Sequence, residues 1–103
     1  MQKSRDYVVE FTVVAREDVR EIVWWYRNER EGLEDRFLFS LKVSLNELGA
    51  NPLIHPIQFQ DIRAVLLKRF PYKVYYTLLE SNVIILGVIH TKRSPKLIRK
   101  RLK

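Results

Sequence analysis

The hydrophobic pattern of the chain changes its period about halfway along, and this change limits the accessible folds more than any other feature. Residues 17–48 repeat apolar side chains at helical spacing, with one interruption at Gly32. Residues 62–91 instead form three segments rich in β-branched and aromatic side chains, separated by Pro71 and by the turn residues 80–82. A helical half followed by a strand half predicts an α+β fold.

The helical half is expected to form two helices. Glu17 and Asp18 should open the first, because acidic side chains favour the positive end of a helix dipole. The second is predicted over residues 33–48, with Gly32 and Gly49 as the expected stops. The predicted inner stripes are Val19, Ile22, Val23 and Tyr26 on the first helix and Phe37, Leu38, Leu41, Leu45 and Leu48 on the second. So short a connection predicts an antiparallel hairpin.

Four strands are expected, over residues 7–14, 62–70, 72–79 and 83–91. The last three are joined by short turns and should pair as an antiparallel meander, whereas the first needs a sheet edge or a parallel neighbour. Residues 83–86 are apolar at every position, as expected of a central strand covered on both faces. The basic residues 96–103 are compatible with a short helix or a frayed tail.

These elements predict one domain over residues 1–103, in which the helical hairpin packs on one face of a mostly antiparallel sheet. The chain is 47% hydrophobic, which supplies a core and excludes disorder. No stretch approaches the roughly 20 apolar residues that span a bilayer, and residues 1–6 do not begin a signal peptide. We therefore expect a cytoplasmic protein with no membrane partner.

Several classes of site are excluded by residue type. The chain has no cysteine, so it has no disulfide, thiol nucleophile or cysteine-based metal centre. His55 and His90 are far apart and lack metal-ligand spacing. Gly32, Gly49 and Gly87 are the only glycines, and they form no phosphate-binding loop. No metal and no cofactor are expected.

Charge divides the chain unevenly. Residues 1–62 hold eight basic and eleven acidic side chains, a net charge of −3. Residues 63–103 hold eleven basic side chains and one acidic one, a net charge of +10. This imbalance predicts a polyanionic partner for the second half, either nucleic acid or an acidic protein segment. The alternative is a solvated basic surface that aids solubility.

The cations of the second half are the main candidates for chemistry. Arg63 lies inside an apolar strand, where a charge needs a function or a partner such as Asp61 or Glu10. His90 ends the last strand among cations and could act as general acid or base on a phosphodiester, or could simply complete the strand. The candidates for binding nucleic acid or an acidic partner are Lys68, Arg69, Lys73 and Lys92.

Three segments of the second half resemble a known family. They are Arg63 inside its strand, KRFPYKVYY at residues 68–76 and VIILGVIHTKRSP at residues 83–95. With the opening strand and the hairpin that carries Trp25 and Tyr26, they look like the RelE/ParE superfamily. These are toxins of bacterial type II toxin–antitoxin systems, often labelled plasmid stabilisation proteins. The resemblance implies a toxin neutralised by a small, partly disordered antitoxin encoded beside it.

The resemblance implies one of two activities. ParE-like members inhibit DNA gyrase, whereas RelE-like members cut messenger RNA in the ribosomal A site. The family's strand arginine matches Arg63, and its strand-end positions match His90 and Arg93. In a metal-independent endoribonuclease the two arginines would stabilise the charged transition state and His90 would move the proton. The chain has no tyrosine after Tyr76, unlike many ribosome-dependent members. This favours gyrase inhibition, with the nuclease or a non-toxic remnant that only binds antitoxin as alternatives.

Apolar side chains off the inner stripes predict an interface. Trp24 points about 150° from the centre of the first inner stripe. Phe39 and Val43 are one turn apart and nearly opposite the second. Exposed apolar clusters mark interfaces, here with the antitoxin in a hetero-oligomer or with a second copy in a homodimer. Alternatively, Trp24 lies flat on neighbouring arginine stems and Phe39 is an isolated surface aromatic.

Overall fold

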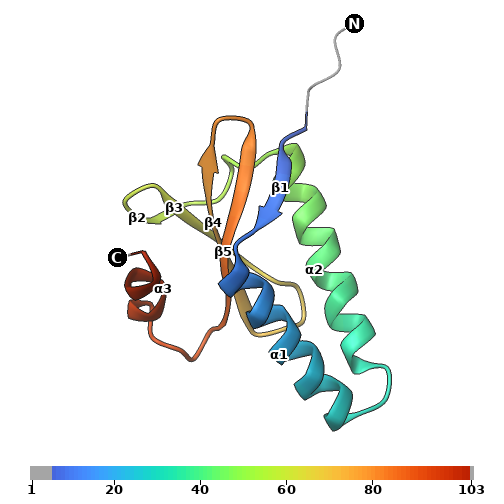
Figure 1. Ribbon diagram of the computed structural model, residues 1–103. Helices are drawn as coiled ribbons and strands as arrows, with labels where there is room; N and C mark the ends of the chain where they lie inside the picture. Colours follow the sequence, from blue (N-terminus) through green and yellow to red (C-terminus); the bar gives the residue numbers. More distant parts are fainter. Residues whose placement is uncertain (1–5, 103) are drawn as a thin grey trace, which may run out of the picture.

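One five-stranded sheet organises the molecule, with a helical hairpin on one face and a short helix on the other (Figure 1). The computed structural model describes residues 6–102. The elements are β1 (Val8–Phe11), α1 (Val13–Glu29), α2 (Leu33–Ala50), β2 (Ile57–Phe59), β3 (Ile62–Leu66), β4 (Tyr72–Leu79), β5 (Asn82–His90) and α3 (Lys96–Arg101). The predicted α+β class, the hairpin and the mostly antiparallel sheet are confirmed. No helix within residues 6–102 has the length and hydropathy needed to span a membrane.

The strand order is β1-β5-β4-β3-β2. β1 lies at one edge and pairs parallel with β5, while every other pair is antiparallel. A sheet edge or a parallel neighbour was predicted for the first strand, and the structure shows both. The other edge strand, β2, was missed in the sequence because it has only three residues and follows Pro56. β5 is an interior strand: Val83 and Ile85 are fully buried, but Ile84 and Leu86 on the other face are only half-buried.

α1 begins earlier than predicted, and β1 is correspondingly shorter. The Oγ1 atom of Thr12 accepts a hydrogen bond of 3.1 Å from the backbone N–H of Ala15, so the helix starts at Val13 rather than near Glu17. A threonine cap satisfies a free N–H group of the first turn, which outweighs the preference for acidic residues there. On α2, Leu38 is exposed and does not belong to the inner stripe.

The two glycines expected as helix stops have different roles. Gly32 has φ 86°, a left-handed conformation that glycine adopts without strain, and it connects the two helices. Gly49 instead lies inside α2, which continues to Ala50, so its prediction as a stop was wrong. A Cβ atom at Gly49 would lie 3.3 Å from the carbonyl oxygen of Tyr7. The glycine thus allows the chain entering β1 to pass close to the helix.

The main core lies between the hairpin and the sheet, and its centre is aromatic. Tyr26 of α1, Phe37 of α2, Phe70 of the β3–β4 turn and Tyr72 of β4 contact one another with ring centroids 5.3–6.3 Å apart. Most of these contacts are edge-to-face, the arrangement that aromatic quadrupoles favour. Burial raises the pKa of Tyr72 to about 12, and the neighbouring Tyr26 adds to this rise.

A second tyrosine joins the sheet to the segment after α2. Tyr76 is fully buried, and its hydroxyl donates a 2.6 Å hydrogen bond to the carbonyl oxygen of Pro52. Burial raises the pKa of Tyr76 from 10.0 to about 12, although the nearby Arg63 opposes the rise. Both tyrosines are therefore held in their neutral form.

An ion pair covers the part of the β5 edge that extends beyond the end of β1. The carboxylate of Asp18 on α1 accepts a 3.0 Å hydrogen bond from the backbone N–H of Val88. Arg101 on α3 donates two hydrogen bonds of 2.7 and 2.9 Å to the same carboxylate, and a third of 3.3 Å to the carbonyl of Leu86. The prediction that Asp18 opens α1 is therefore wrong. Its carboxylate instead joins α1 to β5 and α3.

The raised pKa values of Tyr72 and Tyr76 predict alkaline instability. A pKa that is higher in the folded state favours the protonated form, so this stabilisation is complete below pH 10 and is lost as the pH rises toward 12. The free energy of unfolding, measured by urea titration, should fall steeply between these values. Tyr76→Phe should cost about 1 kcal/mol at pH 7 and make the alkaline fall shallower. Parallel pH curves for the variant and the wild type would contradict this.

The ion pair predicts a specific weakness at α3. Asp18→Asn keeps an acceptor for the Val88 N–H group but leaves the largely buried Arg101 without its counter-ion, and should cost about 2–3 kcal/mol in unfolding free energy. Glu17→Gln is the matched control, because Glu17 forms an exposed pair with Arg20. Amide hydrogen exchange should accelerate in α3 for the first variant only. Equal effects of the two substitutions would show that the largely buried pair contributes no more to the free energy of unfolding than the exposed one.

Candidate partner-binding site

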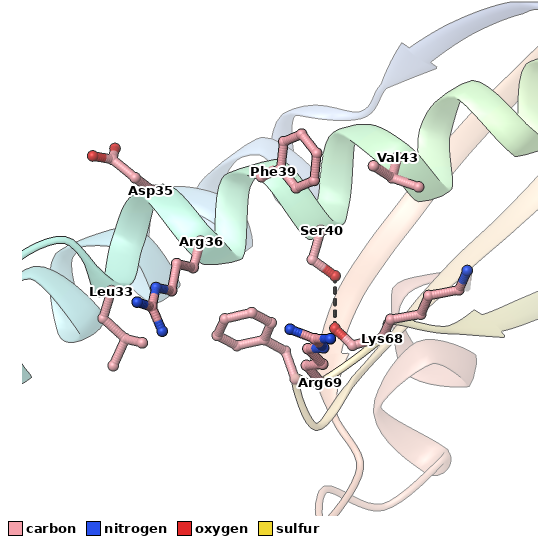
Figure 2. Close-up of a pocket in the computed structure, with 9 residues that line it drawn as sticks. Leu33, Asp35, Arg36, Phe39, Ser40, Val43, Lys68 and Arg69 are labelled. Atoms are coloured by element: carbon pink, nitrogen blue, oxygen red, sulfur yellow. Dashed lines mark hydrogen bonds between the residues drawn. The ribbon is translucent and has the colours of Figure 1, made fainter.

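A groove of about 740 Å³ lies between α2 and the β3–β4 turn (Figure 2). It is lined by Leu33, Asp35, Arg36, Phe39, Ser40, Val43, Lys68, Arg69 and Phe70. Four residues of the sequence predictions meet here, because the predicted interface residues Phe39 and Val43 line the same groove as the predicted cations Lys68 and Arg69. The hydrophobic and basic candidates, which are far apart in the sequence, therefore form one surface.

The wall formed by α2 follows one helical stripe. Leu33, Arg36, Ser40 and Val43 are spaced by three or four residues, so they lie on one side of the helix. Leu33, Arg36 and Ser40 extend toward the turn in Figure 2. Phe39 is next to this stripe and is 69% exposed, an unusually large exposure for a phenylalanine.

The opposite wall is a turn that is held firmly against the helix. The Ser40 hydroxyl donates a 2.8 Å hydrogen bond to the carbonyl oxygen of Lys68. Phe70 packs edge-to-face against Tyr26 and Phe37 in the core. Arg69, between these anchors, has φ 71°, a left-handed conformation that costs a non-glycine residue roughly 1–2 kcal/mol. The anchors on both sides hold the turn in this strained conformation beside α2.

The rim of the groove is positively charged. Arg36, Lys68 and Arg69 are all exposed, and within residues 6–102 none of them forms an ion pair. Asp35 is the one acidic residue of the lining, and its side chain points away from the turn in Figure 2. A groove with an apolar floor and an unpaired basic rim suits an acidic, partly apolar ligand.

A second, smaller cavity of about 240 Å³ brings His90 and Arg93 together beside the ion pair of Asp18 and Arg101. The backbone N–H of Lys92 donates a 3.0 Å hydrogen bond to the Nδ1 atom of His90. The Nε2 atom therefore carries the proton when the imidazole is neutral. The ring of His90 also packs edge-to-face on Tyr72, with centroids 5.2 Å apart.

Arg63 lies elsewhere and contacts neither Asp61 nor Glu10 as an ion pair. Its Nη1 atom donates hydrogen bonds of 2.6 Å to the carbonyl oxygen of His55 and 3.2 Å to that of Leu53. The guanidinium thus holds the segment between α2 and β2. Sequence analysis missed this alternative because the acceptors are backbone atoms, which any residue supplies.

Arg63 and His90 are not brought together. Arg63 pairs with Tyr76 of β4, whereas His90 pairs with Tyr72 of the same strand. Four residues along a strand correspond to about 13 Å, and β4 itself lies between the strands that carry them. The fully buried Val74 occupies the face between the two positions.

The remaining predicted residues lie outside both cavities. Trp24 is 65% exposed on α1, so the predicted apolar patch is divided and only Phe39 and Val43 belong to the groove. Lys73 is half-buried in β4, and Lys92 is exposed just after β5. No group of three histidine or acidic residues within residues 6–102 is placed to hold a metal ion.

Sequence analysis also missed several residues that line these cavities. Arg36 and Ser40 share the helical spacing of Leu33 and Val43, so their common face was visible in the sequence. The approach of the β3–β4 turn to that face was not visible, because no local pattern encodes it. The same holds for Arg101 and Asp18, which are 83 positions apart.

Comparison with known proteins places the chain in a family. The family described as "ParE toxin of type II toxin-antitoxin system, parDE" matches residues 9–95. No curated protein matches the sequence significantly.

Solved structures agree on the fold. A chain of the chromosomal ParDE TA system from P. aeruginosa is similar at 15% identity and a TM-score of 0.61, over 84% of this chain and 98% of that one. The RelBE2 toxin–antitoxin complex from Mycobacterium tuberculosis gives 23% identity and a TM-score of 0.60, over 87% and 97%. The intact E. coli RelBE complex gives 18% and 0.62, over 84% and 99%. The sequence match spans most of the chain and the fold is shared, so this protein belongs to the ParE toxin family of type II toxin–antitoxin systems.

Proposed function

We propose that this toxin arrests growth by binding DNA gyrase, as ParE-like members of the family do, and that it acts without catalysing a reaction. The observation that carries the proposal is the position of Arg63. In a nuclease this arginine would help to stabilise the transition state, but its guanidinium is bound to the carbonyl groups of Leu53 and His55. It also lies on the far side of β4 from His90 and Arg93.

Two further observations support gyrase inhibition. The matched family is that of ParE toxins, and the match covers both strands and helices. The chain also lacks a tyrosine after Tyr76, so no phenol from its C-terminal part can assist proton transfer. A toxin that acts only by binding needs neither a catalytic phenol nor an arginine that stabilises a transition state.

One observation favours the alternative, a ribosome-dependent endoribonuclease. His90 and Arg93 line one cavity. In its imidazolium form His90 could donate the Nε2 proton to the leaving 5′-oxygen beside the Arg93 cation, while the 2′-hydroxyl attacks the phosphorus and gives its proton to water. The ribosome would then have to supply the missing orientation and charge stabilisation. The third hypothesis is that the protein is a non-toxic remnant, which binds antitoxin but has no target.

The target can be identified by two measurements, one on purified toxin and one on bacterial cells in which the toxin has been induced. Purified toxin should inhibit supercoiling of relaxed plasmid by gyrase, and messenger RNA from induced cells should show no new 5′ ends. His90→Ala and Arg93→Ala should leave growth arrest within about threefold of the wild type. New RNA ends produced by the wild-type toxin, and reduced in number by a factor of about 10²–10³ in either variant, would instead establish the nuclease. An absence of both effects and of growth arrest would identify a remnant.

Arg63→Ala should act on stability rather than on activity. Loss of two hydrogen bonds from a charged donor should lower the unfolding free energy by about 2 kcal/mol, because the segment after α2 loses its attachment to β3. Growth arrest should then follow the amount of soluble folded toxin. Lys68→Ala is the control, since Lys68 is exposed and its side chain forms no ion pair within residues 6–102. An unchanged melting temperature with lost arrest would assign Arg63 a direct role at the target.

A further inference from the structure

We infer that the outer face of α1 is a self-association surface, through which two copies of this chain pair with their α1 helices antiparallel. This pairing is independent of the target proposed above and of the groove beside α2. It follows from one property of the helix, whose exposed face is complementary to itself when the helix is turned end to end. The residues that carry this property are Val13, Glu17, Arg20 and Trp24.

These four residues form one narrow stripe along the helix, the α1 stripe. At 100° per residue they lie within a sector of about 60°, on the side of the helix opposite the buried Ile22. Val13 is 79% exposed, Trp24 is 65% exposed, and the two charged residues between them are exposed as well. The α1 stripe therefore leaves an aliphatic and an indole side chain in water at its two ends, with opposite charges in its middle.

The order of these residues is symmetrical about the middle of the α1 stripe. Val13 precedes the midpoint between Glu17 and Arg20 by as many residues as Trp24 follows it. When two helices pack antiparallel about a two-fold axis at this midpoint, Val13 of one copy lies at the height of Trp24 of the other. Glu17 of one copy likewise lies at the height of the other copy's Arg20. Each contact occurs twice, as in every two-fold interface.

Both contacts are favourable. The small side chain of Val13 leaves room for the large indole of Trp24, so both apolar ends are covered when the helices approach, and a tryptophan buries a large apolar area. Glu17 and Arg20 form a 2.9 Å ion pair within each chain. Two such pairs facing each other make a ring of four alternating charges at the two-fold axis. Partial removal of water by the flanking apolar contacts strengthens the attraction within this ring.

The charge of the α1 stripe selects a second copy over a strongly acidic or strongly basic partner. The stripe holds one carboxylate and one guanidinium, so it has no net charge. The net charge of +7 arises beyond residue 62, because residues 63–103 contribute +10 and residues 1–62 contribute −3. At about 0.15 M salt, repulsion between exposed charges more than about 8 Å apart is largely screened. A second α1 helix, run antiparallel, supplies the reversed order of groups at the required spacing.

Sedimentation velocity of the free, full-length toxin tests this pairing. A helix pair is smaller than a standard interface, so the average mass should rise from one chain toward two over a range of about 1–500 µM. Trp24→Ser should weaken self-association by at least about tenfold. Phe39→Ser is the matched control, because Phe39 is a similarly exposed aromatic residue on α2, and it should change self-association by less than about twofold. A wild-type chain that stays monomeric over this range would overturn the inference.

Charge reversal at the two-fold axis provides a second test. Glu17→Arg and Arg20→Glu should each weaken pairing with an identical copy by at least about tenfold, because like charges then meet. An equimolar mixture of the two variants should pair within about threefold of the wild type, since one chain then carries two cations at the axis and the other two carboxylates. Glu47→Arg and Lys42→Glu, at exposed positions of α2, are the controls and should leave self-association unchanged. Circular dichroism and the melting temperature establish that every variant is folded.

The remaining outcomes assign this face of α1 to another occupant or to none. A mixture of the two charge variants that stays monomeric, while the wild type pairs, would overturn the antiparallel arrangement. A monomeric wild type whose affinity for the antitoxin is weakened by Trp24→Ser would assign the face to the antitoxin and overturn the inference. Equal weakening of self-association by Trp24→Ser and Phe39→Ser would also overturn it. Failure of the gyrase proposal would appear separately, in the supercoiling assay, and would leave the measured masses unchanged.

Discussion

The aromatic cluster beneath the hairpin is the interaction on which the rest of the structure depends. Tyr26, Phe37, Phe70 and Tyr72 come from α1, α2, the β3–β4 turn and β4, so one set of ring contacts joins both helices to the sheet. Large aromatic side chains bury much apolar area and also favour defined relative orientations. The cluster thereby sets both the position of the hairpin and the path of the turn.

Both candidate sites border this cluster. Phe70 contributes to it and also lines the groove, while Tyr72 contributes to it and also lines the cavity with His90. The groove therefore stands on a rigid support, although its lining residues lie on a helix face and a strained turn. Near the C-terminal end of β5, the hydrogen bonds from Arg101 to Asp18 hold α3 against the sheet and complete the wall of the smaller cavity. Binding surfaces of this kind need such support, because a partner is recognised by groups whose positions are already fixed.

The separation of the cations changes the interpretation of the basic half. In the sequence, Arg63, Lys68, Arg69, His90 and Arg93 belong to one strongly basic region. The fold distributes them over three places: the segment after α2, the groove and the smaller cavity. Arg63 has exchanged solvent for backbone carbonyls, which explains how a charge is tolerated inside a strand without an acidic partner. Basic side chains therefore stabilise the fold at Arg63, whereas the rim of the groove combines them with the exposed side chain of Phe39.

The sequence by itself determined the α+β class, the helical hairpin, the antiparallel strands and the exposure of Trp24 and Phe39. These features follow from periodicity and turn residues, which act within about a helical turn or between neighbouring strands. Only the tertiary structure decided that β1 joins β5 in parallel, that Arg63 binds the carbonyls of the segment after α2, and that Asp18 meets Arg101. It also decided that the β3–β4 turn reaches the outer stripe of α2 and so converts two separate predictions into one groove. The physical reason is that periodicity records which side of an element avoids water, whereas contacts between distant segments depend on how all the buried sides pack together at once.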